Sequence, residues 1–463
     1  MTDQDICYRA LLTRDRRFDG RFFTAVKTTG IYCRPICPAR TPQRKNIEFY
    51  PSAWAAEAAG FRPCLRCHPE AAPGSPEWMG AEAVVGRALR LIEDGWLEEE
   101  GLEGLAARVG LGERQLRRLF QEHLGAAPVA VAQTRRVQLA KQLIDGTELP
   151  LTQVAFAAGF SSVRRFNDLF VKTYGRAPSA FRRRQGTESG SFTLSLAYRP
   201  PFSWEGLVDY LAPRLFRGCE TFEGGSYRRL QRLADGHAEI SVRPLDNALQ
   251  LTMPVSALPS LVKLRTRARR MFDLDADPLA IAPRLAGLEF TPEQLRVPGA
   301  WDPFESAVRI VLGQQVSVKG AATLAGRLVE RFGEKVAEGE LSHLFPLPSV
   351  LCEAPVEEIG LPRARAETIR RLAREVQAGL PLHAFHGPEL ETALLALPGV
   401  GPWTASMVAL RLGDPDAFPA GDLVIRQRLG GVSAVQAERR AEVWRPFRSY
   451  AAMALWQNDG GVR

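Results

Sequence analysis

The sequence predicts a multidomain protein with four folded units: a small α/β domain, an all-α domain, an α+β domain and a second all-α domain. The chain has 463 residues, which is enough for three or four domains of ordinary size. Four of its seven cysteines cluster near the N-terminus, and a helical segment then repeats itself after about 50 residues. Short alternating runs between residues 191 and 257 precede a long stretch of helical periodicity.

The composition, with 45% hydrophobic and 24% charged residues, excludes a disordered or collagen-like chain. The net charge of +8 favours a polyanionic partner. Residues 1–190 hold 28 basic and 21 acidic side chains, so most of the excess charge lies in this part. Because the sequence shows neither a run of about 18 apolar residues nor a basic leader before an apolar stretch, we expect no export and no membrane span.

Two pairs of cysteines have the spacing of a metal site. Cys33 and Cys37 form one pair, and Cys64 and Cys67 form the other. Four thiolates from two tight turns are typical of tetrahedral zinc, and an odd total of cysteines argues against a disulfide framework. We therefore predict one Zn²⁺ bound by these four residues in a reducing compartment. The spacing alone favours a purely structural zinc site.

Basic side chains surround the cysteines, which predicts a surface suited to phosphate. They are Arg34, Arg40, Arg44, Lys45, Arg62 and Arg66. From about residue 16 to residue 69, notably at 28–35, 46–50 and 59–64, the chain resembles the N-terminal domain of the adaptive-response regulator Ada. In that family the first cysteine, here Cys33, is both a zinc ligand and the nucleophile that accepts a methyl group from a DNA methylphosphotriester. The resemblance implies that Arg34, Arg40, Arg62 and Arg66 face the DNA backbone.

The next segment contains an internal repeat. Residues 105–111 match residues 154–160 at an offset of 49, and residues 125–128 match residues 175–178 at an offset of 50. Each copy reads as a small-residue helix, a glycine turn and a helix with one basic and one apolar face, which is the pattern of a helix-turn-helix. For one copy alone, a helical hairpin in a core would be the better interpretation. Two copies joined by a long helix, from about Val129 to Ile144, are far more specific.

This arrangement resembles the AraC-type DNA-binding domain, most clearly at residues 157–162 and 175–178. Two recognition helices in one chain are expected to meet successive major grooves about 34 Å apart. The resemblance implies promoter DNA and RNA polymerase as partners, a monomer, and a cytoplasmic location at the bacterial nucleoid. The residues expected to contact DNA are Arg114, Arg117 and Arg118 in the first copy, and Ser161, Ser162, Arg164, Arg165 and Asn167 in the second.

In the second half, alternating runs at residues 192–196, 238–242 and 249–253 predict strands, with a helix near Trp204 to Leu211. Further along, Gly399 and Gly401 form a tight turn between helical segments predicted at 389–396 and 404–411. Such a turn exposes backbone amides to which a phosphate can bind.

The glycine turn resembles the helix-hairpin-helix motif of DNA glycosylases, in which an Asp about twenty residues later is catalytic. Asp422 lies 21 residues beyond Gly401. A simple N-cap of the following helix would suit Asp422 equally well. Trp403 stands where strand-cleaving relatives carry a Lys, so no Schiff base is expected and the resemblance implies a monofunctional enzyme.

Residues 192–456, best at 306–317 and 448–451, resemble the AlkA-like 3-methyladenine DNA glycosylase II. That resemblance implies that Trp403 and Trp456 line the base pocket, where indole faces attract cationic alkylpurines by about 0.5 to 2 kcal/mol; core packing is the alternative. Met407 replaces a pocket aromatic, and Gln315 replaces the Leu wedge that fills the gap left by the flipped base. Asp422 is expected to stabilise the sugar cation or to orient water.

Together these assignments predict a zinc-binding methyl acceptor at 1–75, a double helix-turn-helix at 80–186, the α+β domain of a glycosylase at 191–295 and its helix-hairpin-helix domain at 296–463. The predicted protein is a methyl-accepting transcriptional regulator that also excises alkylated purines such as 3-methyladenine and 7-methylguanine. The alternative is a DNA-binding regulator whose degenerate glycosylase half only clamps DNA; the retained Asp422 argues against it. Cys219 and Cys352 lack a Pro-Cys-His-Arg context, so no O6-alkylguanine transfer is expected.

Overall fold

The computed structural model describes residues 4–67, 69, 83–93, 95–182, 190–285, 287–290, 295–380, 382 and 388–457. The chain forms two compact units: residues 1–200, 245–266 and 274–276 make up the first, and residues 201–244, 267–273 and 277–463 make up the second. The predicted domain boundaries at residues 75, 80 and 186 lie outside the described residues. Among the described helices, none has the length and apolar character needed to cross a membrane.

A four-stranded sheet in the order β3-β1-β2-β4 organises the N-terminal domain. β1 pairs antiparallel with β2 and β3, whereas β4 runs parallel to β2. The parallel register places Ile31 opposite Arg62 and Tyr32 opposite Pro63, so the next residue of each strand emerges at the same end of the sheet. The strands are β1 (Phe23–Val26), β2 (Ile31–Cys33), β3 (Ile47–Tyr50) and β4 (Arg62–Pro63).

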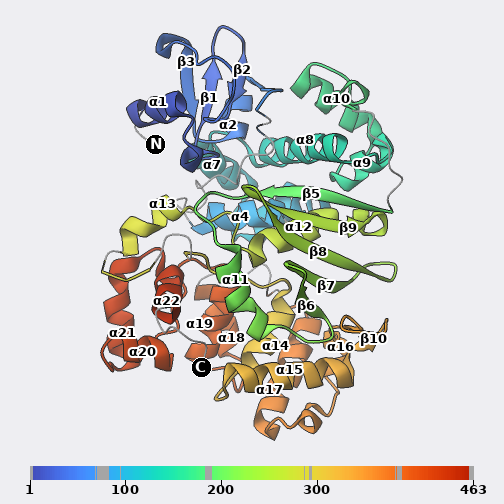
Figure 1. Ribbon diagram of the computed structural model, residues 1–463, viewed down its shortest axis with the longest axis vertical. Helices are drawn as coiled ribbons and strands as arrows, with labels where there is room; N and C mark the ends of the chain where they lie inside the picture. Colours follow the sequence, from blue (N-terminus) through green and yellow to red (C-terminus); the bar gives the residue numbers. More distant parts are fainter. Residues whose placement is uncertain are drawn as a thin grey trace. The chain divides into compact units, whose positions relative to one another are not determined.

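Helix α2 (Ala53–Ala58) packs against this sheet (Figure 1). It begins at Ser52, whose hydroxyl accepts the backbone N–H of Ala55 and thereby caps the helix. Its alanines allow close approach to the rings of Phe23 and Tyr32, which form the core of the domain. The sheet and helix confirm a small α/β domain at the N-terminus.

The predicted duplication of the helix-turn-helix is confirmed. α6 turns into α7 at Gly110, and α9 turns into α10 at Gly159, each glycine having a positive φ of +73° and +86°. The offset grows from 49 between these glycines to 50 between the starts of α7 and α10, as the sequence repeat requires. The helices are α4 (Ala83–Glu93), α5 (Trp96–Glu99), α6 (Gly101–Arg108), α7 (Glu113–Leu124), α8 (Pro128–Gly146), α9 (Leu151–Ala157) and α10 (Val163–Tyr174).

A five-stranded sheet in the order β5-β9-β8-β7-β6 follows. The sequence predicted strands close to β5, β8 and β9, and a helix that coincides with α11 (Trp204–Leu211). It did not predict β6 and β7, although Gly224 and Gly225 between them, with φ of +56° and +74°, are a recognisable hairpin signal. The strands are β5 (Ser191–Ala197), β6 (Glu220–Glu223), β7 (Ser226–Arg232), β8 (His237–Leu245) and β9 (Ala248–Pro254).

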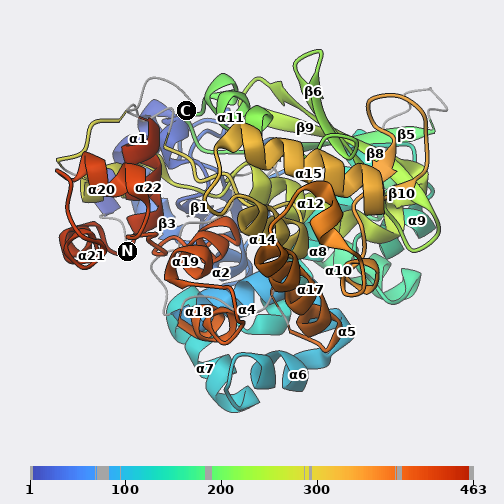
Figure 2. The ribbon, with the colours of Figure 1, turned by 90° about the horizontal axis from the view of Figure 1, so that it is seen from below.

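The remainder of the second unit is mainly helical, as predicted. Figure 2 shows α14, α15 and α17 lying side by side, and α14 packs against both of the others. The hairpin helices α18 and α19 lie close to their predicted positions, although α19 begins two residues earlier because Pro402 suits the first turn. The helices discussed below are α14 (Pro303–Leu312), α15 (Val318–Phe332), α17 (Arg363–Gln377), α18 (Pro388–Leu395), α19 (Pro402–Arg411), α20 (Leu423–Arg428) and α22 (Arg448–Gln457).

Candidate functional site

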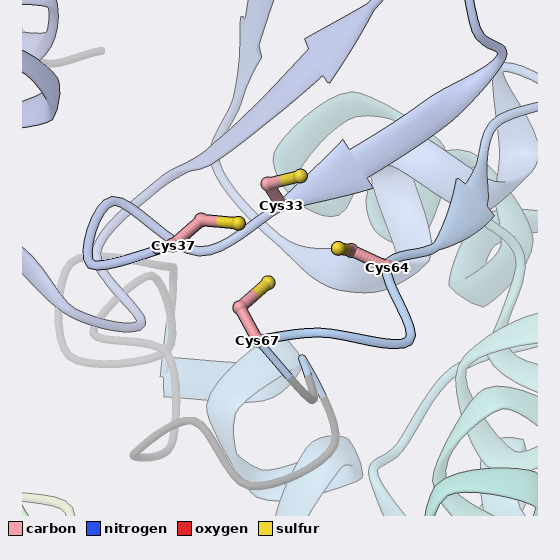
Figure 3. A group of neighbouring side chains, drawn as sticks. All are labelled: Cys33, Cys37, Cys64 and Cys67. Carbon is pink, nitrogen blue, oxygen red and sulfur yellow. The ribbon is translucent and has the colours of Figure 1, made fainter. Parts of the chain in front are cut away.

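Four cysteine sulfurs converge at one end of the N-terminal sheet. Cys33 ends β2, Cys37 lies in the following loop, and Cys64 and Cys67 follow β4; in Figure 3 their side chains point toward a common centre. All four Sγ atoms lie within 4.8 Å of one another. Cys37, Cys64 and Cys67 are buried, whereas Cys33 is partly exposed. The cluster therefore has the form of a four-ligand metal site whose most accessible ligand is Cys33.

The donor chemistry of this cluster fits Zn²⁺. A tetrahedral zinc–thiolate site with bonds of about 2.3 Å places its sulfurs about 3.8 Å apart, which is compatible with this spacing. Hydrogen bonding to Cys37 raises the pKa of Cys33, and hydrogen bonding to Cys33 lowers the pKa of Cys37 to about 7. Because each thiolate opposes the ionisation of the next, four thiolates in this volume require a cation. The residues present thus supply a complete set of zinc ligands.

Arg34, which the sequence assigned to the DNA backbone, forms a largely buried ion pair with Asp19. Its Nε donates to Oδ1 of Asp19 at 2.8 Å, and its Nη2 donates to the other carboxylate oxygen. Its Nη1 donates to the carbonyl of Cys67 at 3.1 Å. The two side chains of the ion pair are only 12% and 7% exposed. These contacts brace the cysteine loops and pair the charge of Arg34 within the protein, and its contact with DNA stays a prediction.

A groove of about 610 Å³ lies beside the cluster. Cys33, Cys37 and Cys64 form part of its wall, and so do the exposed side chains of Arg40 and Arg62. Arg66 lines it as well, so three of the four arginines named from the sequence line the same groove as Cys33. The groove continues to residues 174–176 at the end of α10, which sequence reasoning did not connect with the cysteines.

The two recognition helices have the amphipathic form that was expected. α7 buries Leu116 and Phe120, and α10 buries Phe166 and Phe170, all at 0% exposure. Ser162 is the N-cap of α10, its hydroxyl accepting the backbone N–H of Arg165, so part of its role is structural. The predicted groove-reading side chains that are exposed are Arg114, Arg117, Arg118, Ser161, Arg164, Arg165 and Asn167.

Asp422 accepts four hydrogen bonds. Its Oδ1 accepts the backbone N–H groups of Val424 at 3.1 Å and Ile425 at 3.2 Å, so it is the N-cap of α20. Oδ1 also accepts the indole N–H of Trp456 at 3.1 Å, and Oδ2 accepts that of Trp403 at 3.2 Å. The capping interpretation therefore holds, and the same carboxylate joins the two predicted pocket tryptophans.

Both tryptophans are partly exposed and come from different helices, Trp403 from α19 and Trp456 from α22. Met407 is also partly exposed and lies one turn after Trp403, on the same face of α19. Both indole rings donate from their N–H edge to the carboxylate, while each side chain stays partly exposed. Such an arrangement suits a cationic base placed beside a negative charge.

Gln315 lies in the tight turn between α14 and α15, exposed and with a φ of +55°. Its neighbour Gln314, which the sequence analysis did not identify, donates from Nε2 to the carbonyl of Gly399 at 3.2 Å and to Oγ1 of Thr404 at 2.9 Å. Nη1 of Arg365 in turn donates to the carbonyl of Gln314 at 2.7 Å. The turn that presents Gln315 is thereby fixed to the hairpin.

The two hairpin glycines have different structural environments. Gly399 has a φ of +93°, and a Cβ there would lie 1.9 Å from Oγ1 of Thr368. Gly401 has an ordinary φ of −98° as the N-cap of α19, and a Cβ there would meet nothing within 4 Å. The fold itself requires glycine at 399, whereas the open space at 401 lies before the amides of a helix N-terminus.

Family models match four consecutive parts of the chain. The model described as "Metal binding domain of Ada" matches residues 6–70, and "Helix-turn-helix domain" matches residues 105–184. "AlkA N-terminal domain" matches residues 193–302, and "HhH-GPD superfamily base excision DNA repair protein" matches residues 308–448.

Some curated relatives match one half of the chain, and others match both halves in a single protein. The chain is 44% identical to the "Probable bifunctional transcriptional activator/DNA repair enzyme AlkA" of Mycobacterium tuberculosis, over 98% of this chain and 96% of that one. It is 32% identical to "DNA-3-methyladenine glycosylase 2" of Escherichia coli, over 58% of this chain and 97% of the relative. It is 36% identical to "Bifunctional transcriptional activator/DNA repair enzyme Ada" of Escherichia coli, over 42% of this chain and 53% of the relative.

Proposed function

Because the chain belongs to the family of bifunctional transcriptional activator/DNA repair enzymes, we propose that it combines promoter binding with two separate repair reactions on alkylated double-stranded DNA. The first is stoichiometric methyl transfer from a DNA methylphosphotriester to Cys33. The second is hydrolysis of the N-glycosidic bond of an alkylated purine at Asp422. The two sites use different chemistry, and each is built from its own residues.

In the methyl transfer, Sγ of Cys33 attacks the methyl carbon of the triester. The bond between that carbon and the phosphate oxygen breaks, and its electron pair stays on the oxygen, which restores an ordinary phosphodiester anion. Bound zinc supplies the chemistry that keeps the sulfur a thiolate at neutral pH. Arg40, Arg62 and Arg66 hold the neighbouring phosphates.

The product at Cys33 is a thioether, which is not turned over. Conversion of the thiolate to a thioether also removes one negative charge from a site that faces DNA. Repulsion of the phosphates decreases, and promoter affinity rises, so the repair event acts as a signal. RNA polymerase is the partner that we propose for the promoter-bound form. We further propose that the chain acts as a monomer in the bacterial cytoplasm, at the nucleoid.

In the glycosylase reaction, the flipped alkylpurine stacks on Trp403 and Trp456. The bond between base and sugar breaks, and its electron pair leaves with the cationic base, which becomes neutral. Water adds to the sugar cation and releases one proton to solvent. Oδ1 of Asp422 accepts three hydrogen bonds and Oδ2 accepts one, so four donors from the surrounding helices hold the carboxylate in one orientation. We assign this fixed negative charge to electrostatic stabilisation of the sugar cation.

The observation that carries this glycosylase assignment is the meeting of two indole N–H groups on the Asp422 carboxylate. The test is release of 3-methyladenine from duplex DNA by the full chain and by Asp422→Asn. We expect release by the wild type and a loss of at least 100-fold in the variant, because the sugar cation loses its counter-charge. No release by the wild type would instead support the alternative of a regulator with a degenerate clamp.

A further inference from the structure

Within one compact unit, Glu57 of α2 links the zinc-binding domain to α8, the helix that joins the two helix-turn-helix units. Oε1 of Glu57 accepts the hydroxyl of Tyr32 at 2.7 Å, and its Oε2 accepts the hydroxyl of Thr134 in α8 at 2.6 Å. Tyr32 immediately precedes Cys33. One carboxylate thus connects the strand that carries the reactive sulfur with the helix that supports both recognition helices.

A second contact lies in the groove that Cys33 lines. Gly175 ends α10 with a φ of +72°, and a Cβ built there would lie 2.8 Å from Nη1 of Arg62. The guanidinium of Arg62 therefore rests directly on the end of the second recognition helix. The side chain that follows, Arg176, is exposed and lines the same groove as Cys33.

We propose that Arg176 of the helix-turn-helix domain completes the methyl-acceptor site, so that the damaged backbone is held by both domains during transfer to Cys33. This inference rests on the proposed methyl transfer. It extends that function by assigning a binding residue from a different domain, which none of the sequence motifs indicated.

Electrostatics gives the reason for this arrangement. A methylphosphotriester is neutral, so the lesion itself attracts no cation, and affinity must come from the anionic phosphates on either side. Arg34 is neutralised by Asp19, which leaves Arg40, Arg62 and Arg66 from the zinc-binding domain. Arg176 adds a fourth guanidinium to the lining of the groove, and it comes from the helix-turn-helix domain.

The test compares Arg176→Ala with Lys172→Ala in the full chain. Lys172 lies one turn earlier on α10, is exposed and does not line the groove, so both variants lose one positive charge. The substrate is a short duplex with one methylphosphotriester, and the readout is the rate of methyl uptake at several salt concentrations.

We expect Arg176→Ala to slow uptake about 5- to 10-fold and to reduce the salt dependence by about one phosphate contact, whereas Lys172→Ala retains the wild-type rate. Arg176→Lys should recover part of the loss. Equal rates for Arg176→Ala and wild type, or equal losses in both alanine variants, would overturn the inference. If the wild-type chain takes up no methyl, the proposed function fails and this inference fails with it.

Discussion

The indole N–H of Trp456 donates to Oδ1 of Asp422 across 3.1 Å, although 34 positions separate the two residues in the chain. Trp403 reaches the other oxygen of the same carboxylate from a different helix. Asp422 is thereby fixed by its own helix, α20, and by side chains of α19 and α22. A carboxylate held from three directions has little freedom to rotate, which is what a preorganised electrostatic catalyst requires.

Trp456→Phe keeps an aromatic face but removes the indole N–H. We expect about a 10-fold slower release of 3-methyladenine in single-turnover assays, because the carboxylate loses one of its four donors. Trp301→Phe is the matched control, since Trp301 donates its indole N–H to Gln231 at 2.8 Å in a buried site away from Asp422. That control should lose stability and keep its rate of base release. Wild-type rates for Trp456→Phe would contradict the role assigned to this hydrogen bond.

Alanine substitution of the two hairpin glycines should affect two different properties, the stability of the fold and the affinity for DNA. Gly399→Ala introduces a Cβ that collides with Thr368 at a positive φ, so we expect it to lower the melting temperature without any DNA present. Gly401→Ala meets no protein atom within 4 Å and should keep the wild-type melting temperature. Its effect should appear as weaker binding to undamaged duplex, because the added methyl group occupies the space before the amides of α19. Full duplex affinity of Gly401→Ala would argue against a phosphate at this turn.

Glu220 makes stability depend on pH. Burial raises its pKa to about 7 from the usual 4.5, and the charge of Glu305 adds to the rise, whereas Arg229, which pairs with both carboxylates, opposes it. The folded chain then holds a proton that the unfolded chain releases, so this stabilising contribution is full below about pH 4.5 and is lost as the pH rises through about 7. The free energy of unfolding falls by about 3 kcal/mol over this pH range, because each unit of pKa difference corresponds to about 1.4 kcal/mol.

Glu220→Gln should therefore lose less stability than the wild type between pH 5 and pH 8. Guanidinium unfolding followed by tryptophan fluorescence at the two pH values measures the difference. An identical change of midpoint in both proteins would show that Glu220 is not the titrating group.

Metal content distinguishes the clustered cysteines from the others. Cys67→Ala should reduce zinc from one ion per chain to none and destabilise the N-terminal domain, because three thiolates do not close the site. Cys219→Ala removes an equally buried cysteine outside the cluster and should retain one zinc. Metal analysis of the purified full-length variants provides the measurement. One tightly bound zinc in Cys67→Ala would contradict the four-ligand assignment.

The sequence predicted the features whose functional residues lie close together along the chain. Short stretches of sequence contain the cysteine pairs and the glycine turns. Only 21 residues separate Gly401 from Asp422. It did not predict the partner of Arg34, because a sequence displays a positive charge but not the Asp19 that neutralises it. Gln314 was missed for a related reason, since it contacts the hairpin 85 residues away and belongs to no local pattern. Such contacts arise from packing between distant elements.

The central claim is that one chain holds two independent repair sites. The most direct test measures both reactions on wild type, Cys33→Ser and Asp422→Asn, using one duplex with a methylphosphotriester and another with 3-methyladenine. We predict that Cys33→Ser takes up no methyl yet releases base at the wild-type rate, and that Asp422→Asn shows the reverse. Methyl uptake by Cys33→Ser, or undiminished base release by Asp422→Asn, would contradict the account.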